Sequence, residues 1–171
     1  MSIRRSFLFS TDGGAVHLAN AETLTARLIG TFFDPDDPET PLEFTDIAID
    51  PNTGVVWGTT SSQLYELDFD RNAAFARFAS HRASVTSLAI DGEGRFGLGY
   101  SGLGFIEFTD KRGSFGQTFS APGIEDRLEG DIEVVGGRFY AATRAERLIS
   151  FGLESGTLDV DDSTVGPASG P

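Results

Sequence analysis

The chain has 171 residues, 39% of them hydrophobic, which is enough for one folded domain with a buried core. Its formal net charge of −13 at pH 7 excludes nucleic acid and anionic membrane surfaces as suitable partners, because both would repel it. It contains no cysteine, so disulfides and thiolate metal sites are excluded as well.

The N-terminal segment predicts neither a signal peptide nor a membrane anchor. Arg4 and Arg5 precede the apolar residues Phe7–Phe9, but the apolar run ends at Ser10. A secretory signal needs about 7–15 apolar residues, and no stretch of the chain approaches the roughly 20 apolar residues of a membrane span. We therefore expect a soluble protein without membrane insertion, cytoplasmic by default, whose export would need a non-classical route.

Three strand-length segments, at residues 7–11, 16–18 and 23–29, open the chain and are separated by turn residues. The nine residues 33–41 that follow contain three prolines and four acids. Proline cannot donate to a sheet ladder and carboxylates must stay solvated, so we expect a surface loop here.

This loop holds the densest group of carboxylates in the sequence. Calcium takes six to eight oxygen ligands from such loops, which makes the segment a candidate metal site. The spacing lacks the Gly and Glu of an EF-hand loop, and the alternative is a solvated acidic loop without metal. The candidate ligands are Asp34, Asp36, Asp37 and Glu39.

The segment from Phe44 to Asp70 is the clearest structural unit in the sequence. It contains three short apolar runs, at 47–49, 55–57 and 64–67, and a fourth run follows at 73–78. The runs are rich in β-branched and aromatic residues and are bounded by turn residues, a pattern typical of consecutive β-hairpins. The unit therefore predicts a four-stranded antiparallel meander.

This unit is repeated along the chain. The first strand of the unit, 47–50, is repeated 41 residues later at 88–91, and a third copy ends near Val135. The third strand of the unit, 64–67, is repeated at 105–108 and 148–151. Two different strands thus repeat with nearly the same period, which indicates a repeat architecture. We predict one domain, 1–160, and a flexible tail, 161–171. The first unit lacks its first strand; the units span about 6–31, 44–80, 85–120 and 130–160.

The repeat period resembles that of the blades of NHL-like and related acidic bacterial β-propellers. So does the run at 45–60, which reads Thr-Asp-Ile-Ala-Ile-Asp-Pro-Asn-Thr-Gly-Val-Val-Trp-Gly-Thr-Thr. The resemblance implies an all-β fold of about four blades, each a four-stranded antiparallel meander, in which each first strand lines a channel. A β-sandwich is the alternative fold. The chain could close as a four-bladed ring, form an eight-bladed homodimer, or belong to a longer or open assembly.

Three polar residues stand just before the predicted innermost strands: Asp46, Ser87 and Asp131. In a propeller these positions face one mouth of the channel, where ligands bind, so we predict a ligand site there. The alternative is that these side chains cap turns by bonding nearby backbone N–H groups.

Other polar residues are interpreted as structural. Asp50 and Asp91 precede turn sequences and are expected to form those turns. His17 and His81 are the only histidines, which are too few for an ordinary zinc site. No catalytic residue is assigned. Gly97 and Gly99 lie in a predicted strand that leads into no helix, so we expect close packing there rather than phosphate binding.

The sequence as a whole favours a non-catalytic binding or protein-interaction module for a protein or small-molecule ligand, without a required cofactor. Two alternatives stay open. In one, resemblance to lactonase-type propellers implies a calcium-dependent hydrolase in which Asp46 and Asp131 help to hold the metal. In the other, the chain is a structural part of a larger secreted or surface protein.

Overall fold

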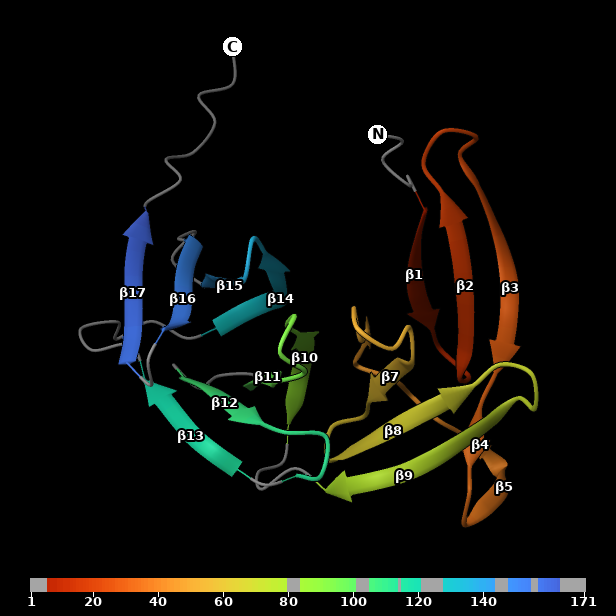
Figure 1. The fold of residues 1–171 in the computed structure, drawn as a ribbon. Helices are drawn as coiled ribbons and strands as arrows, with labels where there is room; N and C mark the ends of the chain where they lie inside the picture. Colours follow the sequence, from red (N-terminus) through yellow and green to blue (C-terminus); the bar gives the residue numbers. More distant parts are fainter. Residues whose placement is uncertain are drawn as a thin grey trace.

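The computed structural model describes residues 6–79, 84–100, 105–113, 115–120, 128–143, 148–154 and 157–163. The described chain consists of antiparallel β-sheets joined by turns (Figure 1). The predicted all-β fold is therefore confirmed. Within these ranges there is no helix with the length and apolar character needed to cross a membrane.

The first sheet has three strands in the order β1 (Ser6–Thr11), β2 (Ala15–Asn20) and β3 (Thr25–Thr31). These are the three strands expected at the start of the chain, and in the described residues the sheet has no fourth. Gly14, in the β1–β2 turn, has φ of 72°, and a Cβ there would lie 2.2 Å from the carbonyl oxygen of Phe32. The turn therefore requires glycine both for its backbone conformation and for space.

The acidic insertion forms a small hairpin, so our expectation of a loop was wrong. Its strands are β4 (Phe33–Asp34) and β5 (Asp37–Pro41), joined by a two-residue turn. The prolines are tolerated because the ladder is very short and interrupted by a bulge, so few backbone donors are needed. The residues of the hairpin are largely exposed, as their composition indicates.

The second sheet is the meander expected from the segment that begins at Phe44. Its strands, in sequence order, are β6 (Asp46–Ile49), β7 (Val56–Thr59), β8 (Gln63–Asp68) and β9 (Ala73–Ala79). Consecutive strands pair antiparallel throughout.

The third and fourth sheets repeat this order. The third contains β10 (Val85–Ile90), β11 (Phe96–Tyr100), β12 (Phe105–Thr109) and β13 (Phe115–Ser120). The fourth contains β14 (Leu128–Val135), β15 (Arg138–Thr143), β16 (Leu148–Glu154) and β17 (Thr157–Ser163). The strand β17 extends three residues beyond the predicted end of the domain, and the rest of the expected tail, 164–171, lies outside the described residues.

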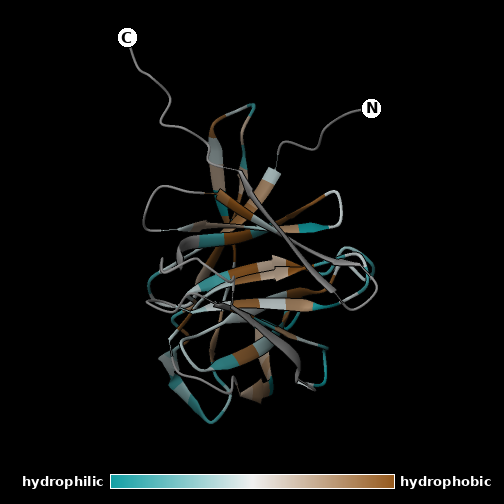
Figure 2. Ribbon diagram, turned by 90° about the vertical axis from the view of Figure 1, so that its left-hand side faces the viewer, coloured by the Kyte–Doolittle hydropathy of each residue, from teal (hydrophilic) through white to brown (hydrophobic). Residues whose placement is uncertain are grey.

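Apolar side chains fill the space between neighbouring sheets. One cluster joins the first and second sheets around Phe32 and Tyr65, and another joins the second and third around Trp57 and Phe96. A third cluster joins the third and fourth sheets around Phe139. Figure 2 shows the apolar stretches along the strands and the hydrophilic residues mainly in the turns. Each sheet is therefore stabilised by burial against its neighbours.

The sheets follow one another around an arc (Figure 1). The first strands β6, β10 and β14 contact one another in that order, and β1 contacts β6. The first and fourth sheets stand at opposite ends of the arc and share no hydrogen-bonded strand pair in the described part of the chain. The first strands thus meet on the inner side of the arc, where the ligand site was predicted.

Candidate functional site

A pocket of about 360 Å³ lies where the inner strands begin. It is lined by Thr45, Asp46, Thr86 and Asp131, and is called the inner pocket below. Asp46 is the first residue of β6, and Asp131 lies 85 positions further along the chain in β14. The structure thus brings together two of the three residues that the repeat indicated as candidates for ligand binding.

Irregularities in two inner strands bring polar side chains to this pocket. In β10 the pairing with β11 shifts between Val85 and Ser87, and Thr86 is the residue between them. In β14 the pairing with β15 shifts between Leu128 and Ile132, next to Asp131. A β-bulge redirects a side chain out of the alternating pattern of the strand. The same kind of irregularity therefore supplies both Thr86 and Asp131.

Backbone N–H groups hold both carboxylates in place. Asp46 Oδ1 accepts a hydrogen bond from the N–H of Ile47 at 2.7 Å, and its Oδ2 accepts one from Leu88 at 2.7 Å. Asp131 Oδ1 accepts one from Ile132 at 2.8 Å. Because Leu88 belongs to the next sheet, Asp46 also ties β6 to β10. Both side chains therefore accept nearby backbone N–H groups, as the capping alternative expects, but the bond from Leu88 joins two sheets, and both residues still line the same pocket.

The inner pocket strongly affects the protonation of Asp46. Burial, then the negative charge of Asp131 and a hydrogen bond with it, raises the pKa of Asp46 to about 8. The two backbone hydrogen bonds act in the opposite direction but are weaker. At neutral pH Asp46 therefore keeps its proton in most molecules of the folded chain.

The third candidate, Ser87, lies beside the inner pocket and does not line it. Its side chain is 1% exposed, and its Oγ lies against Gly99 of the paired strand β11. The register shift that directs Thr86 to the pocket turns Ser87 toward the interior. A sequence reading of repeat positions cannot find Thr86, because nothing in the residue types marks the shift.

The acids of the hairpin have local partners. Asp34 Oδ1 accepts a hydrogen bond from the N–H of Asp36 at 2.9 Å, and Asp37 Oδ2 accepts one from the Thr40 hydroxyl at 2.6 Å. In the ranges that the structure describes, no three histidine, aspartate or glutamate side chains are grouped so as to hold a metal ion. Calcium binding by Asp34, Asp36, Asp37 and Glu39 stays a prediction.

The residues interpreted as structural are found in structural roles. Asp50 Oδ1 accepts the N–H of Asn52 at 2.8 Å, and Asp91 Oδ1 accepts the N–H of Glu93 at 2.9 Å, so both form turns as expected. A Cβ at Gly97 would lie 2.8 Å from the ring of Phe139, which confirms close packing there. His17 stacks on Phe9, whereas His81 lies outside the described residues.

Comparison with known proteins addresses the fold. No protein-family model matches the chain, and no curated protein matches it. Solved structures do match, among them the structure of U3-55K, with a TM-score of 0.63, 11% sequence identity, and coverage of 91% of this chain and 48% of that one. These matching structures are β-propellers. This chain has a β-propeller-like fold.

Two further propellers show the same relationship. YCF48 bound to D1 peptide matches with a TM-score of 0.60 and 14% identity over 94% of this chain and 51% of that one. The nidogen/laminin complex matches with a TM-score of 0.61 and 14% identity over 91% of this chain and 59% of that one. The chain therefore spans about half the length of these propeller chains. In this fold the four sheets are blades, and the inner pocket lies between the inner strands of the second, third and fourth blades.

Proposed function

We propose that this chain is a non-catalytic binding module whose inner pocket takes a positively charged group of a protein or peptide partner. The observation that carries the proposal is the pair Asp46 and Asp131, two carboxyl groups that face one pocket from different blades. A lysine, an arginine or a free amino terminus would relieve the repulsion between them. The hydroxyl groups of Thr45 and Thr86 supply further acceptors at the same place.

Similar propellers support a role in binding. One of the matching structures is YCF48 bound to D1 peptide, and another is the nidogen/laminin complex. The net charge of −13 also favours a basic partner, because a single-sign field attracts opposite charge over long distances. An NHL-like class and a homodimer both stay predictions beside this proposal.

The alternative of a calcium-dependent hydrolase has less support from the inner pocket. Calcium takes about six to eight oxygen ligands, and the pocket is lined by four residues of which only two are acidic. Both of those carboxylates already accept backbone hydrogen bonds. A positively charged side chain needs fewer oxygen acceptors than calcium does, so the four lining residues can provide enough hydrogen-bond acceptors for it.

A selection experiment tests the proposal. Random twelve-residue peptides displayed on phage would be selected on the full chain, and the affinity of the enriched peptides measured by fluorescence anisotropy. We expect enrichment of Lys and Arg, and a loss of affinity of about tenfold or more in the double variant Asp46→Asn/Asp131→Asn, because each charge-assisted bond contributes about 1.5–3 kcal/mol.

The matched control for this loss is Asp12→Asn/Glu43→Gln, which removes two exposed acids outside the pocket. If the control lowers the affinity as much as the pocket variant, attraction is non-specific and the inner pocket is not the site. A selection that enriches no basic residue would contradict the proposal directly.

Binding of such a peptide should also release a proton near neutral pH. Asp46 holds a proton at neutral pH because its pKa is raised to about 8, and an incoming cation favours its ionised form. We therefore expect the affinity to rise between pH 6 and pH 8. Calorimetry of a selected peptide in two buffers of different ionisation enthalpy measures the released proton. The pocket variant should release none.

A further inference from the structure

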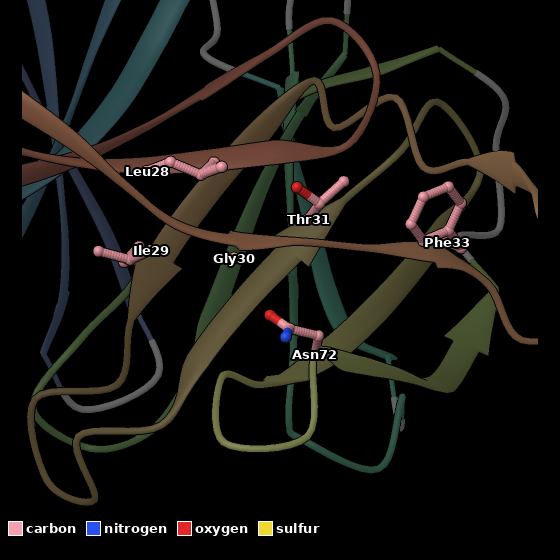
Figure 3. A pocket seen from close by; sticks show the side chains of 6 residues that line it. All are labelled: Leu28, Ile29, Gly30, Thr31, Phe33 and Asn72. Atoms are coloured by element: carbon pink, nitrogen blue, oxygen red, sulfur yellow. The ribbon is translucent and has the colours of Figure 1, made fainter.

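A second concave region lies on the outer side of the first two blades. A pocket of about 440 Å³ is lined by residues 28–31 of β3, by Phe33 and by Asn72. A pocket of about 380 Å³ shares Phe33 and Asn72 and continues along the acidic hairpin to Phe75. We call the two together the rim groove. The first pocket is lined by β3, by Phe33 of the hairpin and by the turn between β8 and β9 (Figure 3), and the second adds the start of β9.

The rim groove exposes large apolar side chains. Leu28 is 55% exposed, Phe33 is 41% exposed and Phe75 is 39% exposed. Leu28 lines one of the adjoining pockets, Phe75 lines the other and Phe33 lines both, so the three follow the length of the groove and are called the apolar strip. A contiguous exposed apolar strip with a polar border is typical of a binding surface.

One side of the rim groove is a strand edge. In the described part of the chain the first blade has the order β1-β2-β3, so β3 is an edge strand, and four consecutive residues of it, 28–31, line the groove. An edge strand presents backbone donors and acceptors to an added strand. Opposite this edge, Asn72 points its amide toward Gly30, where its Oδ1 would lie 3.2 Å from an added Cβ (Figure 3).

The charge around the rim groove is mainly negative, although Arg27 is exposed beside Leu28 and the Arg77 guanidinium lies 5.8 Å from the centre of the Phe75 ring. The hairpin contributes Asp34, Asp36, Asp37 and Glu39. Two arginines on the second blade are already paired, Arg71 with Asp68 at 3.7 Å and Arg77 with Glu66 at 2.6 Å. The acidic hairpin also affects the buried Tyr65 beneath it: burial, and then the negative charges of Asp34 and Asp36, raise the pKa of Tyr65.

We propose that the rim groove binds an extended peptide of a partner protein, which adds to the edge of β3 and alternates apolar with basic side chains. The edge supplies backbone hydrogen bonds, the strip of Leu28, Phe33 and Phe75 accepts the apolar side chains, and the hairpin acids attract the basic ones. Alternation follows from the strand period of two residues. A second copy of this chain is disfavoured as the occupant, because it would bring two acidic hairpins together. This site is separate from the inner pocket and does not rest on its proposed role.

The probe for this proposal is an acetylated nine-residue peptide of alternating Lys and Leu, added to ¹⁵N-labelled full chain. Backbone amide signals of Leu28 to Thr31 and of Asn72 should shift. We expect the double variant Leu28→Ala/Phe33→Ala to weaken binding about tenfold. Both side chains are exposed, so the variant should keep its fold. The control is Val135→Ala, which removes a large apolar side chain from the fourth blade that is 60% exposed, more than either Leu28 or Phe33.

Two further peptides test the chemistry of the rim groove. Alternating Glu and Leu should not bind, because the hairpin acids would repel it, and alternating Lys and Ser should bind far more weakly, because it lacks apolar side chains. The proposal would be overturned if the Lys-Leu peptide did not bind, or if Val135→Ala weakened its binding as much as the double variant does. It would also be overturned if the peptide shifted only the amide signals of Thr45, Asp46 and Thr86. Sedimentation of the free chain as a dimer that Leu28→Ala/Phe33→Ala dissociates would overturn it as well, because a second copy would then be the occupant.

Discussion

Replacing Asp46 with asparagine is expected to remove a fall in the stability of the folded chain between about pH 4 and pH 9. In the folded state the pKa of Asp46 is raised from 3.8 to about 8, because the group is buried beside the charge of Asp131 and hydrogen-bonded to it. Between these two pH values the folded chain keeps a proton that the unfolded chain has released. The free energy of unfolding of the wild type must therefore fall as the pH rises from about 4 to about 8.

The size of this fall has an upper limit. A full proton difference corresponds to about 1.4 kcal/mol per pH unit, and the open pocket, where Asp131 is exposed, reduces the effect by solvent screening. We expect a loss on the order of 1–3 kcal/mol for this pair. Asparagine carries no charge, and its side-chain oxygen can still accept the N–H of Leu88, but its amide nitrogen cannot accept the N–H of Ile47. The loss of that one hydrogen bond is the same at every pH, so Asp46→Asn should not show the fall in stability with rising pH.

The measurement is urea unfolding at several pH values, followed by the fluorescence of Trp57, the single and buried tryptophan. Asp50→Asn is the matched control, because the contribution of Asp50 to stability changes with pH in the opposite direction. Asp50 is partly desolvated, which acts against ionisation, but hydrogen bonds from Asn52 and Thr53 and the charge of Lys111 outweigh this and lower its pKa. Its contribution is present above pH 4 and is lost as the pH falls through the lowered pKa. Parallel curves of unfolding free energy against pH for the wild type and Asp46→Asn would show that the pKa of Asp46 is not raised in the folded chain.

The repeated strands were predictable because their information is local. Apolar runs of strand length, turns such as Asp50–Gly54, and a constant period define β6 to β17 without reference to distant contacts. The hairpin β4–β5 was missed because its prolines were interpreted as incompatible with pairing. A ladder that short needs so few donors that Pro38 and Pro41 do not prevent it.

The two binding regions differ in how far the sequence could reveal them. The repeat placed Asp46 and Asp131 in equivalent positions of different blades, so their meeting at the centre followed from the architecture. Thr86 reaches the same pocket through a bulge, which leaves no mark in the residue types. The rim groove joins Leu28, Phe33 and Asn72 from three elements, and their proximity depends on the packing of two blades.

Replacing Gly99 with alanine is expected to destabilise the chain by about 3 kcal/mol or more. A Cβ at Gly99 would lie 2.2 Å from Ser87 Oγ and 2.9 Å from Ile132 Cδ1. Ser87 and Ile132 are 1% and 2% exposed, so neither can move into solvent to make room. Gly92→Ala is the matched control, because no atom lies within 4 Å of its added Cβ, and it should change the free energy of unfolding by less than about 0.5 kcal/mol.

A second substitution separates overpacking from a backbone effect. Ser87→Ala removes the Oγ that Gly99→Ala would strike, so the double variant should recover part of the lost stability. The same contact links the fold to the inner pocket, since Ser87 adjoins Thr86 and Ile132 adjoins Asp131. A Gly99→Ala variant that still folds must displace Ser87 or Ile132 and should show a smaller fall in stability with rising pH, because burial of Asp46 remains while the contribution of Asp131 is reduced. If Gly99→Ala lowers the free energy of unfolding no more than Gly92→Ala does, the third and fourth blades do not pack closely around Gly99. Close packing there would then not be what holds Asp46 near Asp131.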